Sequence, residues 1–147
     1  MQRNSTESDS PRVYIEYTSS TTGGERLNPE ERWSDRADQT TTLSVQRLYA
    51  FEPKHLFFKD SVEVDPSVLE CSEVYLVVVR YQTGDTFGRS LGNFHFYSVR
   101  KTEQEAIEDR RACETPVKKG DYGSYRPWDG YFERLEFVEI MKMPLHR

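Results

Sequence analysis

Apolar and polar residues alternate along much of the chain, which is the pattern of strands in a half-buried antiparallel sheet. The stretches with this pattern are Val13–Tyr17, Thr42–Phe51, Phe94–Arg100 and Leu135–Met143, with shorter extended pieces at Leu56–Phe58 and Val62–Val64. Val74–Tyr81 is apolar on both faces, so we expect this strand to lie in the centre of the sheet.

Two short helices are predicted from the signals at their N-termini. Asn28 is followed by proline and two glutamates, which is typical of a helix start, and this helix would run to about Ala37. Thr102 and Glu105 have the spacing of a capping box, and the helix that follows would run to about Cys113. Its apolar face is thin, so we expect it to lie on the surface of the sheet.

These elements predict an α+β protein with a single antiparallel sheet of about five or six strands and one or two short helices. Strands and helices do not alternate along the chain, which argues against a doubly wound parallel sheet. We expect residues 1–11 to be a mobile polar tail and residues 12–147 to form one α+β domain. The longest predicted loops are Thr18–Gly24, Gln82–Gly92 and Glu114–Gly130.

Composition narrows the classes of protein to which the chain can belong. Of its 147 residues, 13% are aromatic, a share that excludes wholesale disorder. No apolar run approaches the roughly 20 residues that span a bilayer, and the first residues lack the apolar core of a signal peptide. We therefore expect a soluble cytoplasmic protein without membrane contact. The net charge of −5 opposes binding to nucleic acid, whose affinity comes mainly from Lys and Arg.

The sequence favours neither a metal site nor a cofactor. The two cysteines, Cys71 and Cys113, lie far apart and lack a CxxC spacing, so we expect two reduced thiols. Simple alternation would place His95 on one strand face with Tyr97 and Val99, and we interpret it as a structural histidine.

The segment Gly88–Gly92 matches G-x-S-x-G, the motif that holds the nucleophilic serine of α/β-hydrolases on a turn between a strand and a helix. Here the segment lies in a predicted loop and leads into the predicted strand Phe94–Arg100, so no helix follows Ser90. We therefore interpret the match as accidental. We predict no catalytic residue and expect that the protein is not an enzyme.

The same loop is a candidate site for a small phosphate-containing ligand. Its three glycines would leave backbone N–H groups accessible to an anion, and hydroxyl and guanidinium donors lie beside them. The candidate ligand-binding residues are Thr83, Asp85, Thr86, Arg89 and Ser90. The Asp85 carboxylate would repel phosphate, and the lysine of a P-loop is missing, so an ordinary hairpin loop is the favoured alternative.

Aromatic and basic residues gather in the first predicted helix and in the last predicted loop. Trp, Tyr and Arg dominate the residues that carry the affinity of protein interfaces. The candidate partner-binding residues are Arg32, Trp33, Arg36, Tyr125, Arg126, Trp128 and Tyr131. The alternative, about as strong, is that the two tryptophans cover the sheet as core residues.

Three segments resemble small uncharacterised accessory proteins of tailed bacteriophages. They are Tyr81–Gly92, which contains Y-x-T-G-D-x-F-G, Val99–Ala106, and Trp128–Leu135, which contains W-x-G-Y-F-E-x-L; Glu31–Arg36 is similar too. The resemblance implies an accessory protein with no established activity and supplies no catalytic residues.

From this resemblance we expect a non-enzymatic phage protein in the cytoplasm of the bacterial host. It would bind and inhibit a host protein such as a defence component, an expectation that rests on analogy. The alternative is a small-ligand or nucleotide-binding protein that sequesters its ligand with the Gly84–Gly92 loop. The sequence leaves the oligomeric state open.

Overall fold

The computed structural model describes residues 10–23, 38–54, 59–85, 88–114 and 132–147. The predicted helix from Asn28 to Ala37, the extended piece Leu56–Phe58 and residues 1–9 of the predicted tail lie outside these ranges.

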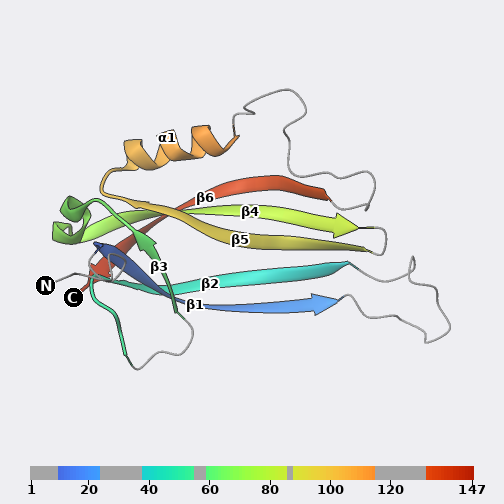
Figure 1. The fold of residues 1–147 in the computed structure, drawn as a ribbon, viewed down its shortest axis with the longest axis horizontal. Helices are drawn as coiled ribbons and strands as arrows, with labels where there is room; N and C mark the ends of the chain where they lie inside the picture. Colours follow the sequence, from blue (N-terminus) through green and yellow to red (C-terminus); the bar gives the residue numbers. More distant parts are fainter. Residues whose placement is uncertain (1–9, 24–37, 55–58, 86–87, 115–131) are drawn as a thin grey trace, which may run out of the picture.

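The described residues form a six-stranded sheet with one α-helix (Figure 1). The strands are β1 Arg12–Gly23, β2 Gln39–Tyr49, β3 Lys59–Glu63, β4 Glu73–Asp85, β5 Gly88–Arg100 and β6 Phe132–His146. Helix α1 spans Glu103–Glu114, and a 3-10 helix, η3, spans Pro66–Glu70. The strand order is β3-β1-β2-β5-β4-β6, and β2 also pairs with β6. The α+β class is confirmed. The strand that contains Val74–Tyr81 is paired on both edges, with β5 and β6, so it is an interior strand, although it is fifth in the order and not at the centre of the sheet.

The expectation of a purely antiparallel sheet is wrong, because β2 runs parallel to two other strands. Its first residues pair with β5 through Gln39 and Ser90, and its last residues pair with β6 through Leu48 and Leu145. Strands β5 and β6 are both antiparallel to β4, so they run in the same direction, and β2 can join both of them. The pairings β2–β5, β5–β4, β4–β6 and β6–β2 therefore close a ring.

The predicted loop at Thr18–Gly24 is also wrong, because Thr18–Gly23 continues β1 alongside β2. The two strands are joined across this stretch by side-chain hydroxyls as well as by backbone. Ser20 Oγ lies 2.8 Å from Thr42 Oγ1, and Thr21 Oγ1 lies 3.0 Å from Thr41 Oγ1. Cross-strand hydroxyl pairs and the β-branched threonines favour a strand over the loop that their polarity suggested.

The predicted loop Gln82–Gly92 belongs almost entirely to the hairpin of β4 and β5, whose described parts end at Asp85 and resume at Gly88. Gly92 has a positive φ of 75°, and a Cβ at this position would lie 2.3 Å from the carbonyl oxygen of Thr41. Glycine is therefore required here because β5 and β2 approach each other closely, and not because the chain turns in a loop.

Apolar side chains pack on both sides of β4. The larger cluster lies on the side of β1 and β2, where Ile15, Leu48, Leu76 and Val78 are fully buried. The smaller cluster lies on the side of α1, where Val77 and Ala106 are fully buried. Figure 1 shows α1 next to β6, running roughly along the strands, and the helix contacts β4 and β5 as well as β6. The helix is therefore a surface layer, as its thin apolar face predicted.

Arg80 on β4 extends into the side of the sheet that carries the larger cluster and contacts the other strands of the ring. Its Nη1 donates to Glu139 of β6 at 2.7 Å, and its Nη2 donates to the carbonyl of Gly92 of β5 at 3.0 Å. The carbonyl oxygen of Thr41 on β2 is 3.5 Å from the same Nη2. Only 12% of the Arg80 side chain is exposed, and its Nε has no hydrogen-bond partner.

We predict that Arg80→Met lowers the free energy of unfolding by about 2–3 kcal/mol, because the change leaves the half-buried Glu139 without its cation and removes two charge-assisted hydrogen bonds. Urea denaturation at neutral pH measures the change. Arg89→Met is the matched control, because Arg89 also pairs with a carboxylate at 2.7 Å but is 53% exposed. An exposed ion pair contributes about 0–1 kcal/mol, so equal losses in the two variants would contradict the prediction.

Candidate functional site

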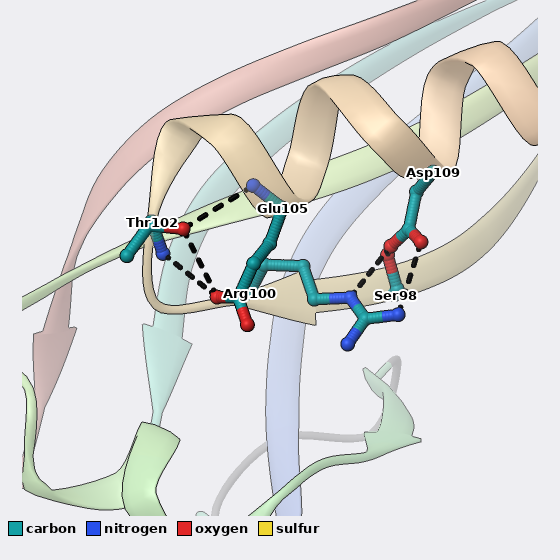
Figure 2. A network of polar contacts seen from close by, with 5 residues as sticks. All are labelled: Ser98, Arg100, Thr102, Glu105 and Asp109. Carbon is teal, nitrogen blue, oxygen red and sulfur yellow. Dashed lines mark hydrogen bonds and ion pairs between the residues drawn. The ribbon is translucent and has the colours of Figure 1, made fainter.

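Helix α1 starts at the capping box that the sequence predicts. The backbone N–H of Glu105 donates to Thr102 Oγ1 at 3.2 Å, and the backbone N–H of Thr102 donates to Glu105 Oε1 at 3.3 Å. Figure 2 shows this pair next to a second polar network that joins the helix to β5. The capping box fixes where the helix begins, and the second network fixes how it lies on the sheet.

Asp109 is the buried charged residue of the described chain, and it anchors α1 to the end of β5. Arg100 Nε donates to Asp109 Oδ2 at 2.6 Å and Arg100 Nη2 donates to Oδ1 at 3.0 Å, while Ser98 Oγ donates to Oδ2 at 2.6 Å (Figure 2). Burial of the carboxylate acts to raise the pKa of Asp109, but the hydrogen bonds from Arg100 and Ser98 outweigh it, so the pKa lies below the ordinary value. The carboxylate is therefore ionised at neutral pH.

The helix covers only part of the strands beneath it. Its 12 residues extend about 18 Å at 1.5 Å per residue, whereas the 13 residues of β4 extend about 43 Å. The face of the sheet that carries α1 therefore continues beyond the end of the helix. This exposed continuation is the candidate functional site.

A hollow of about 370 Å³ lies in this continuation, which places it in the size range of small-molecule sites. We call it the outer hollow, and its lining residues are Val79, Tyr81, His95, Cys113, Glu133, Arg134 and Leu135. Val79 and Leu135 belong to the smaller apolar cluster and supply an apolar surface. Tyr81, His95 and Glu133 bring polar side chains to the same lining, whereas Arg134 lies between Glu133 and Leu135 on β6, so its side chain points to the other face of the strand.

A bulge in β5 shapes the side of the outer hollow that is nearest to α1. Val77 pairs with Ser98 and Val78 pairs with Phe96, so Tyr97 is the extra residue, and 42% of it is exposed. The bulge corrects the prediction that His95, Tyr97 and Val99 share a face, because Val99 is buried in the larger cluster while His95 lines the outer hollow.

Cys113, at the end of α1, also lines the outer hollow. Burial raises the pKa of its thiol, so the thiol stays protonated at neutral pH. The pKa of Tyr97 is raised as well. The largest cause is repulsion between the Tyr97 phenolate and the Cys113 thiolate when both groups are deprotonated. Because the thiolate is the nucleophilic form of cysteine, Cys113 is suited to packing rather than to reaction.

The residues predicted to bind a ligand do not come together as a phosphate cradle in the described chain. Ser90 Oγ donates to Asn93 Oδ1 at 3.2 Å, and Asn93 Nδ2 donates to Thr83 Oγ1 at 3.4 Å. An amide is not a base that could activate the Ser90 hydroxyl. Thr86 and the side chain of Asp85 lie outside the described residues.

Arg89, the expected anion ligand, forms an ion pair instead. Its Nη2 donates to Asp38 Oδ2 at 2.7 Å, and this hydrogen bond holds the pKa of the Asp38 carboxyl below its usual range. A phosphate that reached Arg89 would have to displace Asp38 or share the guanidinium with it.

All the predicted partner-binding residues lie outside the described residues: Arg32, Trp33, Arg36, Tyr125, Arg126, Trp128 and Tyr131. The sequence analysis missed Tyr81, Glu133, Arg134 and Leu135 as site residues. A signal for them was present, because the predicted helix was visibly shorter than the central strand and its thin apolar face could not cover both ends of that strand.

Comparisons of the chain with protein-family models, with curated proteins and with solved structures find no significant match. Within the described part of the chain, no helix is long and apolar enough to cross a membrane. In the same residues, the His, Cys, Asp and Glu side chains do not form a group that could hold a metal ion.

We predict that Asp109→Asn lowers the free energy of unfolding by about 1–2 kcal/mol at pH 7, because Arg100 loses a charged acceptor. The folded pKa of Asp109 is below its unfolded value of about 3.9, so its contribution is complete above that pH and disappears as the pH falls through the folded pKa. Urea denaturation between pH 7 and pH 2.5 should show the difference between parent and variant shrinking at the acidic end. Glu108→Gln, at an exposed neighbouring position, is the control, and a difference that is constant with pH would count against the prediction.

Proposed function

We propose that this protein is a non-enzymatic binding protein that holds a partner protein at the outer hollow. The observation that carries the proposal is that α1 ends before the sheet does. The hollow beyond it is lined by the apolar Val79 and Leu135 together with Tyr81, His95 and Glu133. A pocket that combines apolar and aromatic side chains is typical of the centre of an interface, where a few anchors carry most of the affinity.

The resemblance of Tyr81–Gly92, Val99–Ala106 and Trp128–Leu135 to accessory proteins of tailed bacteriophages supports a host protein as the partner. On this proposal the protein acts in the cytoplasm of the infected bacterium and inhibits a host factor, such as a defence component, by occupying it. Two of the resembling segments supply residues of the outer hollow, namely Tyr81 and, from the last segment, Glu133 and Leu135.

We predict that Tyr81→Ala weakens binding of the partner about thirtyfold, the effect of losing about 2 kcal/mol at an interface hot spot. The partner is first captured from a bacterial lysate on the immobilised protein, identified by mass spectrometry and purified, and its affinity is then measured by calorimetry. Phe51→Ala is the matched control, because Phe51 is an exposed aromatic residue that packs against Tyr49, away from the outer hollow. Equal affinities for Tyr81→Ala and Phe51→Ala would refute the outer hollow as the binding site.

Trp128→Ala tests in the same assay whether the aromatic residues predicted from the sequence take part. A variant that melts like the parent and has lost affinity supports Trp128 as an anchor. A variant that unfolds identifies Trp128 as a core residue, and a variant that folds and binds like the parent refutes its role in binding.

The second candidate function is the binding of a small phosphate-containing ligand. The volume of the outer hollow favours it. The Ser90 and Thr83 hydroxyls, which Asn93 joins across β5 and β4, lie outside the lining of this hollow and would be a separate contact. This candidate places the ligand on paired strands rather than in the flexible glycine loop that the sequence suggested.

We predict that such a ligand, if it also contacts the glycine segment, binds more weakly to Arg89→Ala by about 1.5–3 kcal/mol, the value of a charge-assisted hydrogen bond. Calorimetry with nucleoside monophosphates, diphosphates and cyclic nucleotides measures this. Because Asp38 competes for the Arg89 guanidinium, Asp38→Asn should strengthen the binding. Absence of heat with all of these nucleotides would rule out the second candidate.

A further inference from the structure

Strand β6 has one edge that is almost free of strand partners within the described chain. Its first edge pairs with β4 from Phe132 to Pro144. Its second edge pairs only at Leu145 and His146, with the end of β2. The remaining backbone groups of this second edge, over most of a 15-residue strand, are therefore available to another strand.

The side chains that β6 places on the α1 side of the sheet form an ordered series. Leu135, Val138 and Ile140 belong to the smaller apolar cluster, while Glu133 and Lys142 line hollows on the same side. The step from Leu135 to Val138 is three residues, because Phe137 pairs with Arg80 and Leu135 with Tyr81, which makes Glu136 a bulge. When the bulged residue Glu136 is left out of the count, Leu135 and Ile140 are equally far from Val138, and so are Glu133 and Lys142. The series therefore has an acid at one end and a base at the other.

We propose that β6 pairs antiparallel with β6 of a second copy of this chain, about a twofold axis at Val138. In this register Glu133 lies opposite Lys142 of the second copy, and Leu135 lies opposite Ile140 of the second copy. The twofold axis repeats both pairs, so an apolar centre is flanked by two ion pairs. Directly opposite apolar and oppositely charged side chains stabilise an antiparallel pair, and the two sheets become one.

A hollow beside this edge supports a second copy as the occupant. It has a volume of about 390 Å³ and lies between α1 and β6, lined by Tyr75, Glu103, Ile107, Arg110, Ile140 and Lys142. Ile107 and Ile140 are only half-buried there. In the proposed register, Leu135 and Glu133 of the second copy lie opposite Ile140 and Lys142, which line this hollow, so the second copy would border it.

The test uses two variants, neither of which should form a homodimer but which should form a heterodimer with each other. Glu133→Lys places lysine opposite Lys142 in a homodimer, and Lys142→Glu places glutamate opposite Glu133. Lys142→Glu also removes the ion pair of Lys142 with Glu73 of its own chain, which is exposed and contributes about 0–1 kcal/mol. Each variant alone should dimerise at least about tenfold more weakly than the parent, because two attractive pairs become repulsive. An equimolar mixture of the variants restores both opposite-charge pairs, so it should form heterodimers with an affinity near that of the parent.

Analytical ultracentrifugation of the parent, each variant and the mixture measures the dissociation constants. The control for an acid-to-lysine change is Glu63→Lys, at an exposed position of β3, which is at the other end of the strand order from β6. A misfolded variant cannot restore association in a mixture, so restoration is specific to the proposed register. A parent that remains monomeric at high concentration would overturn the proposal, as would a mixture that associates no better than the single variants.

Amide hydrogen exchange of β6 gives a second readout. In the parent, protection of the residues around Val138 should increase with protein concentration. If these amides are protected equally at every concentration in a monomeric protein, another part of the chain already occupies the edge, and the proposal is wrong. The experiment uses purified protein alone, so its outcome does not depend on whether the outer hollow binds a partner.

Discussion

The closed ring of strands depends on the guanidinium of Arg80. Strand β2 pairs with β5 only at its first residues and with β6 only at its last, so between these points no backbone ladder holds it to the rest of the ring. Arg80 lies at this opening and reaches Glu139 of β6 and the carbonyl of Gly92 of β5. A single planar cation with several donors is suited to join strands whose backbones have separated, because its hydrogen bonds point in different directions. The cost is one buried N–H without a partner.

The relation between helix and strand lengths determines where this protein can bind something. A helix rises 1.5 Å per residue and a strand about 3.3 Å, so a helix must have about twice as many residues as a strand to cover it. In this chain α1 and β4 have nearly equal numbers of residues. The Asp109–Arg100–Ser98 network fixes the helix over one part of the sheet, and the outer hollow is the part that remains.

The sequence was informative where local signals determine structure. The capping box of Thr102 and Glu105 located the start of α1, and the apolar character of both faces identified β4 as an interior strand with a partner on each edge. Loops were predicted wrongly at Thr18–Gly23 and around Gly92. At Thr18–Gly23 the polar hydroxyls pair across two strands, and at Gly92 the glycine is required because two strands approach closely. In the sequence alone, both features look like the signals of a loop.

The parallel pairings of β2 and most of the candidate site could not be predicted in this way. The pairings join residues from distant parts of the chain, for which a local pattern carries no information. The bulge at Tyr97 places His95 and Val99 on different faces of β5, whereas simple alternation assigns them to the same face. The tryptophans on which the sequence analysis placed partner binding lie outside the described residues, so their role stays a prediction.

The pairing of Leu48 with Leu145 also constrains the order in which the protein folds. The hairpin of β4 and β5 joins neighbouring segments, so it closes a short loop and forms at little entropic cost. The contact between β2 and β6 closes a loop of about a hundred residues, and topologies rich in such contacts fold slowly. We therefore expect the contact between β2 and β6 to form late. Because it consists of only two residue pairs, we also expect it to be among the first to open when the native state fluctuates.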